Sequence, residues 1–422
     1  MYKQRIADTL LERKLLGKGA VLIEGPKWCG KTTTAHQFAK SVLDLGDSLV
    51  LKQSSQMMEV DSKLLLQGET PRLIDEWQTL PAIWDSVRNE IDKRNQFAQF
   101  ILTGSSVLPD PNATIHSGTG RFARIKMRPM SLFESGESSG SISLKALFDG
   151  DTIEFSSNKL QLTDIAFLLC RGGWPQTTFM SNEIALEQAF DYLDSIVQND
   201  LYRVDGVLRN PDRSLRLLRS YARNISQQVS LRTICDDIKT NDTFTLSEDT
   251  IADYISALKK LYVIEDLSAW NPNLRSKAAI RVSDTRHFVD PSIAVAALGI
   301  GPNDLMNDLE TFGLLFENMA VRDLRVYAEV LDGTLYHYRD SDKLECDAVL
   351  HRRNGTYGLI EIKLGGQTKI EEGVKSLKIL EQKLDTTRMS KPSFLMVLTA
   401  VGDFAYKRED GVWVVPIGCL KN

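Results

Sequence analysis

Eight residues near the amino terminus combine two glycines, a lysine and a threonine in a spacing that suits an anion. Four residues separate Gly25 from Gly30, and Lys31 and Thr32 follow directly. The preceding run, AVLIEG, is apolar and predicts a buried strand, whereas the residues from Lys31 onward have the apolar spacing of a helix that ends near Gly46. This is the G-x-x-x-x-G-K-[ST] pattern in its strand–loop–helix setting, and it predicts a phosphate-binding loop.

Each residue type in this loop has a physical reason. The glycines permit backbone angles that turn successive N–H groups inward around an anion, and the next helix adds the positive end of its dipole. We expect Lys31 to reach the β- and γ-phosphates of ATP and the Thr32 hydroxyl to ligate Mg²⁺. The loop residues predicted to bind nucleotide are Gly25, Pro26, Lys27, Trp28, Cys29, Gly30, Lys31, Thr32 and Thr33.

Polar residues at the ends of two later apolar runs would complete such a site. LIDEWQ places Asp75 and Glu76 at the carboxyl end of a strand, where ligands bind in open α/β sheets. Asp75 is expected either to bind Mg²⁺ directly or to hold another group that binds the ion. Glu76 is expected to be the base that accepts the proton of the attacking water. In ILTGSS, Thr103 either senses the γ-phosphate or orients the water, or, like Ser105, only caps the strand end. Arg121 either contacts nucleotide, in its own chain or across a subunit interface, or forms a surface salt bridge.

A second group of candidate residues lies near the carboxyl terminus. In YGLIEIKL, Glu361 and Lys363 alternate with apolar residues, so both side chains share one face of a strand, with Cα atoms about 6.5–7 Å apart. A hairpin with the preceding run, ECDAVL, would bring Asp347 beside Glu361. Two carboxylates and a lysine form a site suited to Mg²⁺, in which the metal polarises a phosphodiester and Lys363 steadies the nucleophile or the developing charge. A Glu-x-Lys pair also arises by chance, and such a site can bind metal without cleaving anything.

The middle of the chain predicts three helices followed by two extended segments. The helices are RSLRLLRSYARNIS, SLRTICDDIKT and SEDTIADYISALKKLYVI, and the extended segments are YVIEDLSAW and AAIRVSDTRHFVD. This order is typical of a winged helix, whose third helix enters a DNA major groove. The third helix is expected to expose Asp249, Asp253, Ser256 and Lys259, and the basic residues in or near the wing are Arg275, Lys277, Arg281 and Arg286. Because that helix face is not basic, DNA contact and a purely structural or protein-binding role both remain open.

The motifs GPKWCGKTTTA, LIDEWQ, ILTGSS, GTGRFARIKMRPMSLFE and RGGWP resemble those of the bacterial and archaeal AAA-type ATP-binding proteins with a C-terminal domain of uncharacterised function. The resemblance runs over nearly the whole chain and implies ATP binding, ATP hydrolysis and a restriction-endonuclease-like C-terminal domain. The expected element order α-β-β-β-α-β matches the core of that fold. Asp347, Glu361 and Lys363 resemble its nuclease signature, and Glu317 occupies the place of its helical acidic residue. Cys346 stands where many members have proline.

The composition limits the class of protein. The chain has 422 residues, 42% hydrophobic and 25% charged, which predicts two to four ordinary globular domains. The net charge of −5 does not indicate a strongly basic nucleic-acid binder, and five scattered cysteines indicate neither a disulfide framework nor a zinc knuckle. No apolar run is long enough to cross a bilayer and no secretion signal is seen, so we expect a cytoplasmic protein without membrane contact.

These observations predict an α/β protein of three parts. A P-loop AAA-type ATPase domain is expected over residues 1–150, a helical and winged-helix segment over 151–285, and a restriction-endonuclease-like α/β domain over 286–422. The predicted cofactors are ATP and Mg²⁺. The predicted metal ligands are Thr32, Asp75, Asp347 and Glu361, and the predicted catalytic residues are Glu76, Glu317, Asp347, Glu361 and Lys363.

The predicted function is an ATPase coupled to a Mg²⁺-dependent nuclease-like domain that acts on nucleic acid. The alternative is an ATP-driven DNA- or protein-binding regulatory module whose nuclease fold is inactive. The partners considered are ATP, DNA bound through the winged-helix and nuclease-like domains, and a second copy of the chain.

Overall fold

The computed structural model describes residues 2–104, 117–151, 156–240, 247–271, 283–387 and 389–422. The chain divides into two compact units. The first contains residues 1–129, 198–209 and 257–262, and the second contains residues 130–197, 210–256 and 263–422. Four residues considered above, Ser105, Arg275, Lys277 and Arg281, lie outside the described residues.

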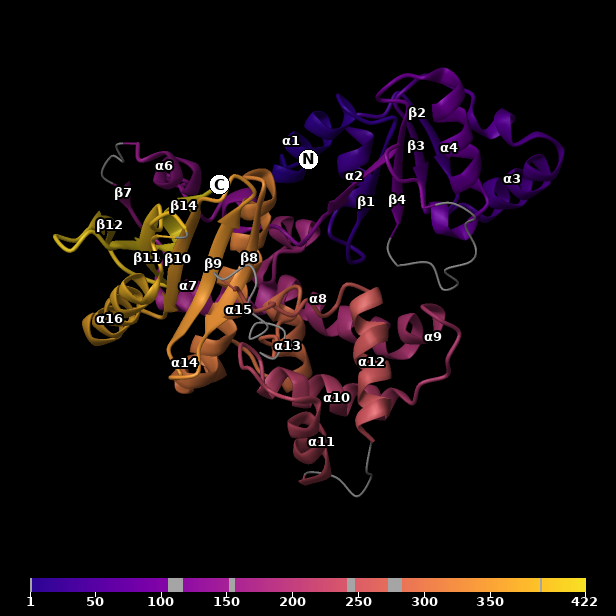
Figure 1. Ribbon diagram of the computed structural model, residues 1–422. Helices are drawn as coiled ribbons and strands as arrows, with labels where there is room; N and C mark the ends of the chain where they lie inside the picture. The colour runs from indigo at the N-terminus through magenta and orange to yellow at the C-terminus, as the bar shows by residue number, and fades with distance from the viewer. Residues whose placement is uncertain (1, 105–116, 152–155, 241–246, 272–282, 388) are drawn as a thin grey trace. The chain divides into compact units, whose positions relative to one another are not determined.

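The first unit is built on a five-stranded parallel sheet with the order β2-β3-β4-β1-β5 (Figure 1). Its strands are β1 (Ala20–Glu24), β2 (Ser41–Asp44), β3 (Arg72–Asp75), β4 (Phe100–Gly104) and β5 (Phe122–Lys126). Its helices are α1 (Ile6–Leu15), α2 (Lys31–His36), α3 (Ser48–Asp61), α4 (Ile83–Arg94) and the short α9 (Leu201–Arg203). The central strand β4 is buried along its length and β1 is buried except at Glu24, as expected for parallel strands with both faces covered.

The helix after the phosphate loop is shorter than the sequence predicted. It ends at His36, and residues 41–44 form β2 instead of the last turns of a helix. In β2, Val42 pairs with Leu73 and Leu43 pairs with Ile74 of β3. An apolar residue such as Leu43 satisfies a helical pattern and a strand pattern equally well, so the edge of the sheet decided this segment.

The second unit contains most of the helices. They are α5 (Leu132–Ser135), α6 (Leu144–Asp149), α7 (Leu162–Arg171), α8 (Asn182–Ser195), α10 (Pro211–Arg223), α11 (Leu231–Thr240), α13 (Pro291–Leu298), α14 (Pro302–Asn307), α15 (Leu309–Val330) and α16 (Gln367–Lys383). The helix α12 (Glu248–Lys260) has its first nine residues in this unit and its last four in the other. A π-helical turn, Ile196–Asp200, follows α8.

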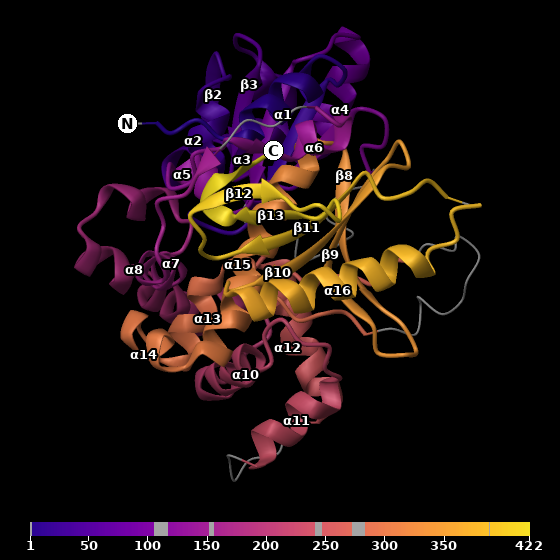
Figure 2. The same ribbon diagram turned by 90° about the vertical axis from the view of Figure 1, so that its left-hand side faces the viewer.

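The sheet of the second unit has seven strands in the order β7-β12-β13-β11-β10-β9-β8 (Figure 2). Its strands are β7 (Ser156–Ser157), β8 (Gly333–Arg339), β9 (Glu345–Arg352), β10 (Tyr357–Lys363), β11 (Phe394–Thr399), β12 (Phe404–Lys407) and β13 (Trp413–Pro416). Strands β8, β9 and β10 are antiparallel, whereas β10, β11 and β13 are parallel. The order α15-β8-β9-β10-α16-β11 is the α-β-β-β-α-β order that the sequence predicted.

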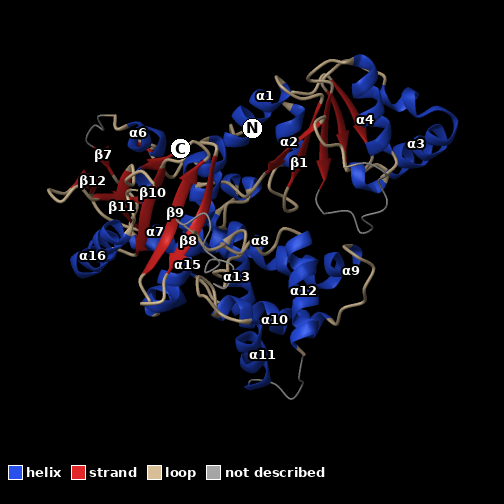
Figure 3. Cartoon of the chain, in the orientation of Figure 1, coloured by secondary structure: helices blue, strands red, loops and turns tan. Residues whose placement is uncertain are grey.

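Residues that follow the first sheet belong to the second unit. Strand β6 (Ile142–Ser143) pairs with β14 (Leu420–Lys421). Strand β7 pairs with β12, and the two lie side by side in Figure 3. The first continuous stretch of the first unit ends at residue 129, and segments within residues 130–157 supply strands to partners more than 240 residues later. Such long-range pairing leaves no local signal in the sequence.

The three middle helices, α10, α11 and α12, form as predicted. Of the second extended segment expected after them, residues 278–282 lie outside the described residues. Isolated antiparallel bridges join Ile264 to Phe288 and Leu267 to Thr285, and a parallel bridge joins Ala269 to His337 of β8. The last bridge attaches these segments to the seven-stranded sheet. Among the described residues, no helix is both long enough and apolar enough to span a membrane.

Candidate nucleotide and acidic sites

The phosphate loop has the backbone that the sequence predicted. Gly25 has φ 152° and Gly30 has φ 97°, and a Cβ atom on Gly25 would lie 2.0 Å from the carbonyl oxygen of Met127. Gly30 is the N-cap of α2, so Lys31 and Thr32 form its first turn. Lys31 is buried, and its Nζ donates to the carbonyls of Gly25 and Pro26 at 3.0 and 2.7 Å. The loop therefore encloses a cation, as a phosphate cradle requires.

Two residues that the sequence did not indicate hold this loop from outside. The buried guanidinium of Arg5 donates to the carbonyl of Cys29 at 2.6 Å and to that of Arg128 at 2.8 Å. Lys27 forms an ion pair with Asp200 at 2.6 Å. Arg5 lies 24 residues before Cys29 in the sequence, and Asp200 lies 173 residues after Lys27. No local sequence pattern could therefore have indicated these contacts. Among the remaining loop residues, Trp28 has φ 70° and is 40% exposed, and Thr33 is exposed.

The carboxyl ends of β1, β3 and β4 bring three predicted residues together. Asp75 is buried at the end of β3, and one of its carboxylate oxygens, Oδ1, accepts hydrogen bonds from the hydroxyls of Thr32, at 3.0 Å, and Thr103. Thr103 is fully buried. Glu76, the next residue after Asp75, has a left-handed backbone with φ 52°, and its carboxylate accepts a hydrogen bond from the amide of Gln78. Strands β3, β4 and β1 are parallel neighbours, so the residues at their carboxyl ends lie close together.

Arg121 lies at the amino-terminal ends of the strands of this sheet, opposite to the carboxyl ends that carry Asp75 and Thr103. It directly precedes β5, and its carbonyl accepts from the backbone N–H of Ala20, the first residue of β1. The phosphate loop follows the last residue of β1, about 16 Å away at 3.3 Å per residue. The Arg121 side chain is exposed and pairs with Asp92 at 2.9 Å. Contact between Arg121 and a nucleotide in its own loop does not fit this position, and the surface salt bridge is the interaction observed. Contact across a subunit interface stays a prediction.

Asp347, Glu361 and Lys363 meet in the second unit. The antiparallel register of β9 and β10 pairs Ala348 with Ile360, and one step further places Asp347 opposite Glu361. The Nζ of Lys363 lies 3.0 Å from Oδ2 of Asp347 and 2.7 Å from Oε2 of Glu361. The same Asp347 oxygen accepts from the backbone N–H of Ile362 at 2.7 Å. Both carboxylates therefore converge on one ammonium group.

The surroundings of this acidic cluster, Asp347, Glu361 and Lys363, favour carboxyl groups that are either protonated or paired with a positive charge. Glu361 is 4% exposed. Helix α16 covers it, because a Cβ atom added to Gly373 of that helix would lie 3.3 Å from the Cβ of Glu361. Burial and then the charge of Asp347 raise the pKa of Glu361 to about 8. Burial alone would lower the pKa of Lys363, but the charges of Asp347 and Glu361 raise it. The cluster carries more acidic than basic groups, and a cation would stabilise its ionised form.

Glu317 of α15 approaches the same cluster. Burial, and next the charge of Asp347, raise the pKa of Glu317 well above its ordinary value. Among the residues that the structure describes, no group of three or more histidine, cysteine or acidic side chains is arranged to hold a metal ion. Asp347 and Glu361 thus form a bridged pair, and the structure does not place Glu317 as a third ligand beside them.

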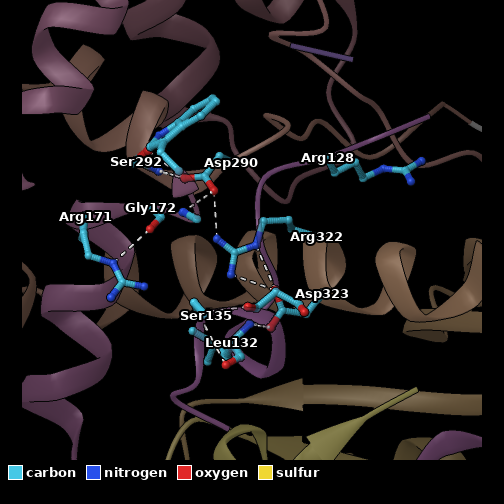
Figure 4. Close-up of polar contacts among 12 residues, drawn as sticks. Arg128, Leu132, Ser135, Arg171, Gly172, Asp290, Ser292, Arg322 and Asp323 are labelled. Carbon is cyan, nitrogen blue, oxygen red and sulfur yellow. Dashed lines mark hydrogen bonds and ion pairs between the residues drawn. The ribbon is translucent and has the colours of Figure 1, made fainter. Parts of the chain in front are cut away.

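The RGGWP and MRPMSLFE motifs meet at a buried charge network (Figure 4). Arg322 of α15 pairs with Asp290 at 2.8 Å and with Asp323 at 2.7 Å. Asp290 accepts from the N–H of Gly173 at 2.9 Å, and Asp323 accepts from the N–H of Leu132 at 2.9 Å. A Cβ on Gly173 would lie 2.2 Å from the Met130 carbonyl oxygen. These motifs therefore join distant segments of the second unit and do not form a ligand site.

Of the basic residues near the expected wing, Arg286 is described. Its guanidinium is buried and donates to Asp266 at 2.9 Å and to the carbonyl of Val229 at 3.0 and 3.1 Å. Arg286 therefore stabilises the fold locally and is not presented to a nucleic acid.

Three family models match separate parts of the chain. Residues 17–135 match an AAA domain, residues 162–304 a domain of unknown function (DUF8612), and residues 312–420 another domain of unknown function (DUF4143). Two curated relatives, the uncharacterized protein Mb2031c of Mycobacterium bovis and the uncharacterized protein Rv2008c of Mycobacterium tuberculosis, are each 23% identical over 382 residues. These residues cover 89% of this chain and 77% of each relative.

Solved structures with similarity to the chain include two ATP-related proteins. The Walker-type ATPase PABY2304 of Pyrococcus abyssi is 14% identical with a TM-score of 0.42, covering 70% of this chain and 96% of its own. AMPPCP-bound DnaA from Aquifex aeolicus is 14% identical with a TM-score of 0.30, and the match covers 61% of this chain and 88% of that protein. The ORC1 protein of Aeropyrum pernix in complex with DNA is 13% identical with a TM-score of 0.27, covering 73% and 94%. Scores of this size do not establish a common fold.

The match over residues 17–135 defines the class of the first unit. It is an AAA-type P-loop domain, as the sequence predicted, and its intact phosphate loop supports ATP binding. The two other matches are to domains without an assigned function. The winged-helix and restriction-endonuclease-like identities accordingly stay predictions.

Proposed function

We propose that the chain hydrolyses ATP in its first unit and uses its second unit to act on nucleic acid. The hydrogen-bonded set of Thr32, Asp75 and Thr103 beside the phosphate loop carries the ATPase part of the proposal. A hydroxyl and a carboxylate 3.0 Å apart are oxygen donors of the kind that Mg²⁺ takes. Thr32 and Asp75 would hold the ion, which would neutralise charge on the β- and γ-phosphates.

The chain's own groups have distinct tasks in this reaction. Lys31 leaves the carbonyls of Gly25 and Pro26 to pair with phosphate oxygens, a stronger charge-assisted interaction. Glu76, at the end of β3 and held by Gln78, accepts the proton of the attacking water. Thr103 keeps the Asp75 carboxylate oriented through its hydroxyl.

Nucleotide titration tests the first part. We expect Lys31→Ala to weaken ATP binding by about 10- to 150-fold, because a hydrogen bond to a charged group contributes about 1.5–3 kcal/mol. Isothermal titration calorimetry on the full chain measures this effect. Lys40→Ala, at an exposed lysine beyond α2, is the matched control and should bind as the wild type does. Unchanged affinity in Lys31→Ala would remove the basis of the nucleotide site.

The acidic cluster supports a metal-dependent nuclease activity for the second unit. Asp347 and Glu361 would hold a divalent cation, which would polarise a phosphodiester, and Lys363, at 3.0 and 2.7 Å from these carboxylates, would stabilise the developing negative charge. The α-β-β-β-α-β order that carries these residues is consistent with a restriction-endonuclease-like domain. The convergence of both carboxylates on one cation is the observation that favours this activity.

A cleavage assay tests the second part. Purified protein is incubated with single- and double-stranded DNA and with RNA, with Mg²⁺ or Mn²⁺, in the presence and absence of ATP. Glu361→Gln should abolish metal-dependent cleavage while ATP turnover persists, because the two sites lie in different units. Glu372→Gln replaces an exposed glutamate of α16 and should cleave normally. Cleavage that survives Glu361→Gln would exclude this cluster as the active site.

The alternative is an ATP-driven DNA- or protein-binding regulatory module with an inactive nuclease fold. Its support is the ion pairing of Lys363 with both Asp347 and Glu361, because the lysine already compensates charges that a metal would otherwise compensate. The same assay separates the two functions. Nucleic-acid binding without cleavage under every metal condition would favour the regulatory module.

A further inference from the structure

The ion pair between Lys27 and Asp200 joins the phosphate loop to a segment far along the chain, within the first unit. Lys27 is the third residue of the loop, and its Nζ lies 2.6 Å from Oδ1 of Asp200. The two partners differ in exposure, because the Lys27 side chain is 45% exposed and the Asp200 side chain is 9% exposed. The ammonium group can therefore turn toward solvent or a ligand, whereas protein encloses the carboxylate.

Asp200 depends on Lys27 for the compensation of its charge. Among the described residues, no other charged side chain pairs with Asp200. A buried carboxylate that loses its cation is costly, so Asp200 holds Lys27 firmly. Asp200 is also the last residue of the π-helical turn Ile196–Asp200, and single π-helical turns are rare and often occur at functional sites.

A nucleotide in the phosphate loop competes with Asp200 for Lys27. Its β- and γ-phosphates bring several negative charges to the loop, and a lysine ammonium group binds phosphate as well as carboxylate. While Asp200 neutralises Lys27, the loop attracts phosphates through Lys31 and its backbone N–H groups and gains little from Lys27. Once phosphate takes Lys27, the Asp200 carboxylate is stable only in contact with water, which requires its turn to move.

We propose that Asp200 sets the affinity for ATP by withholding Lys27 from the phosphates, and that bound nucleotide loosens residues 198–206. The two effects are one coupling, because a ligand that weakens an ion pair binds more tightly when that pair is broken. The chain enters the first unit at residue 198, so the segment that loosens is one of the connections between the units. This inference rests on the proposed binding of ATP.

Calorimetric titration of the full chain with Mg²⁺ and AMPPCP, a non-hydrolysable ATP analogue, measures this coupling. Asp200→Asn should tighten binding by about 5- to 10-fold, at the lower end of the usual range for coupled sites, because Lys27 becomes available to the phosphates. If Asp200 only supported the structure of the loop, affinity would fall instead. Asp205→Asn is the matched control, since Asp205 lies in the same segment and pairs with Arg209 at 2.7 Å and not with the loop. Its affinity should equal that of the wild type.

Two further measurements separate competition for Lys27 from direct repulsion between Asp200 and the phosphates. In a Lys27→Met background, Asp200→Asn should tighten binding by a smaller factor than in the wild type, because the group under competition is absent. Amide hydrogen exchange in the wild type should become faster over residues 198–206 when AMPPCP binds. This measurement needs no substitution, and a misfolded variant cannot imitate the expected gain in affinity.

The inference is overturned if Asp200→Asn does not tighten binding, or if Asp205→Asn tightens it equally. Equal factors with and without Lys27, or unchanged exchange over residues 198–206, also overturn it. In each of these cases the proposed ATP binding stands. If the wild type binds no AMPPCP, the ATPase proposal and the inference fall together.

Discussion

At the scale of single residues, the two candidate sites compensate their carboxylates differently. Asp75 accepts hydrogen bonds from two neutral hydroxyls, so its negative charge remains to attract a cation. Asp347 and Glu361 already share the ammonium group of Lys363. A metal ion at the first site adds to the existing network, whereas a metal ion at the second must displace or accompany a lysine. We therefore expect the acidic cluster to bind divalent cations more weakly than the ATP-loaded first site.

Glu76 is the residue whose replacement best separates binding from hydrolysis. In Glu76→Gln the amide cannot accept the proton of the attacking water, so ATP turnover should fall by about 10²- to 10⁴-fold while ATP affinity stays near that of the wild type. Phosphate release measures turnover, and calorimetric titration measures affinity. The control Glu59→Gln replaces an exposed residue of α3. Wild-type turnover in Glu76→Gln would show that another residue is the base.

At the scale of elements, short connections are fixed by a few close backbone contacts. The phosphate loop contacts the segment after β5 through Gly25, whose missing side chain leaves room for the Met127 carbonyl. In the second unit, Gly173 approaches the Met130 carbonyl in the same way, and both Gly173 and Leu132 donate to carboxylates paired with Arg322. Helix α15 thus supplies the charge that joins two loops to one another.

Removing that charge should destabilise the second unit strongly. Arg322→Met leaves Asp290 and Asp323 buried without their cation, and loss of one partner from a buried ion pair costs about 3–5 kcal/mol. The free energy of unfolding, measured by urea denaturation of the full chain, should fall by that amount in the transition of the second unit. Arg353→Met, at an exposed arginine of the same unit, should change it little. A loss below about 1 kcal/mol would mean that the network contributes little to stability.

At the scale of the whole molecule, the two candidate sites lie in separate units, each with its own sheet and core. Ligands of one site should therefore stabilise that unit first. ATP should raise the unfolding temperature of the first unit according to its concentration. This difference gives a means of assigning calorimetric transitions.

The two buried histidines of the second unit should each contribute a loss of stability on mild acidification. Burial, and then the charge of Arg325, lower the pKa of His287 to about 3, and burial lowers that of His337 to about 4, both from an ordinary 6.5. Below pH 6.5 each of these two histidines therefore binds more protons in the unfolded chain than in the folded chain, whereas Glu361, whose pKa is raised to about 8, does the opposite. The contribution of each histidine to the free energy of unfolding should fall by up to about 1.4 kcal/mol per pH unit below pH 6.

Calorimetry between pH 7 and 5 checks this dependence on the transition that ATP does not shift. His287→Gln should reduce the slope, because the amide does not titrate, while His36→Gln, at an exposed histidine of the first unit, should leave it unchanged. The same pH dependence in His287→Gln and in the wild type would contradict the assignment of a buried neutral histidine at this position.

The sequence by itself determined the parts whose chemistry is local. The glycine spacing of the phosphate loop, the polar ends of two apolar runs and the alternation of Glu361 and Lys363 with apolar residues are all features of a few consecutive residues, so periodicity and residue type were sufficient. The element order of the second sheet was likewise predictable, because its strands and helices are long and regular.

Only the tertiary structure decided the rest. The pairing of β6 and β7 with strands at the carboxyl end, the support of the phosphate loop by Arg5 and Asp200, and the place of Arg121 at the far edge of the first sheet depend on contacts between distant segments. The buried hydroxyl of Thr285, which has no hydrogen-bond partner among the described residues, became visible only when distant segments packed together. Residue types specify local conformation, but burial and the lack of a hydrogen-bond partner are properties of packing, which no single segment contains.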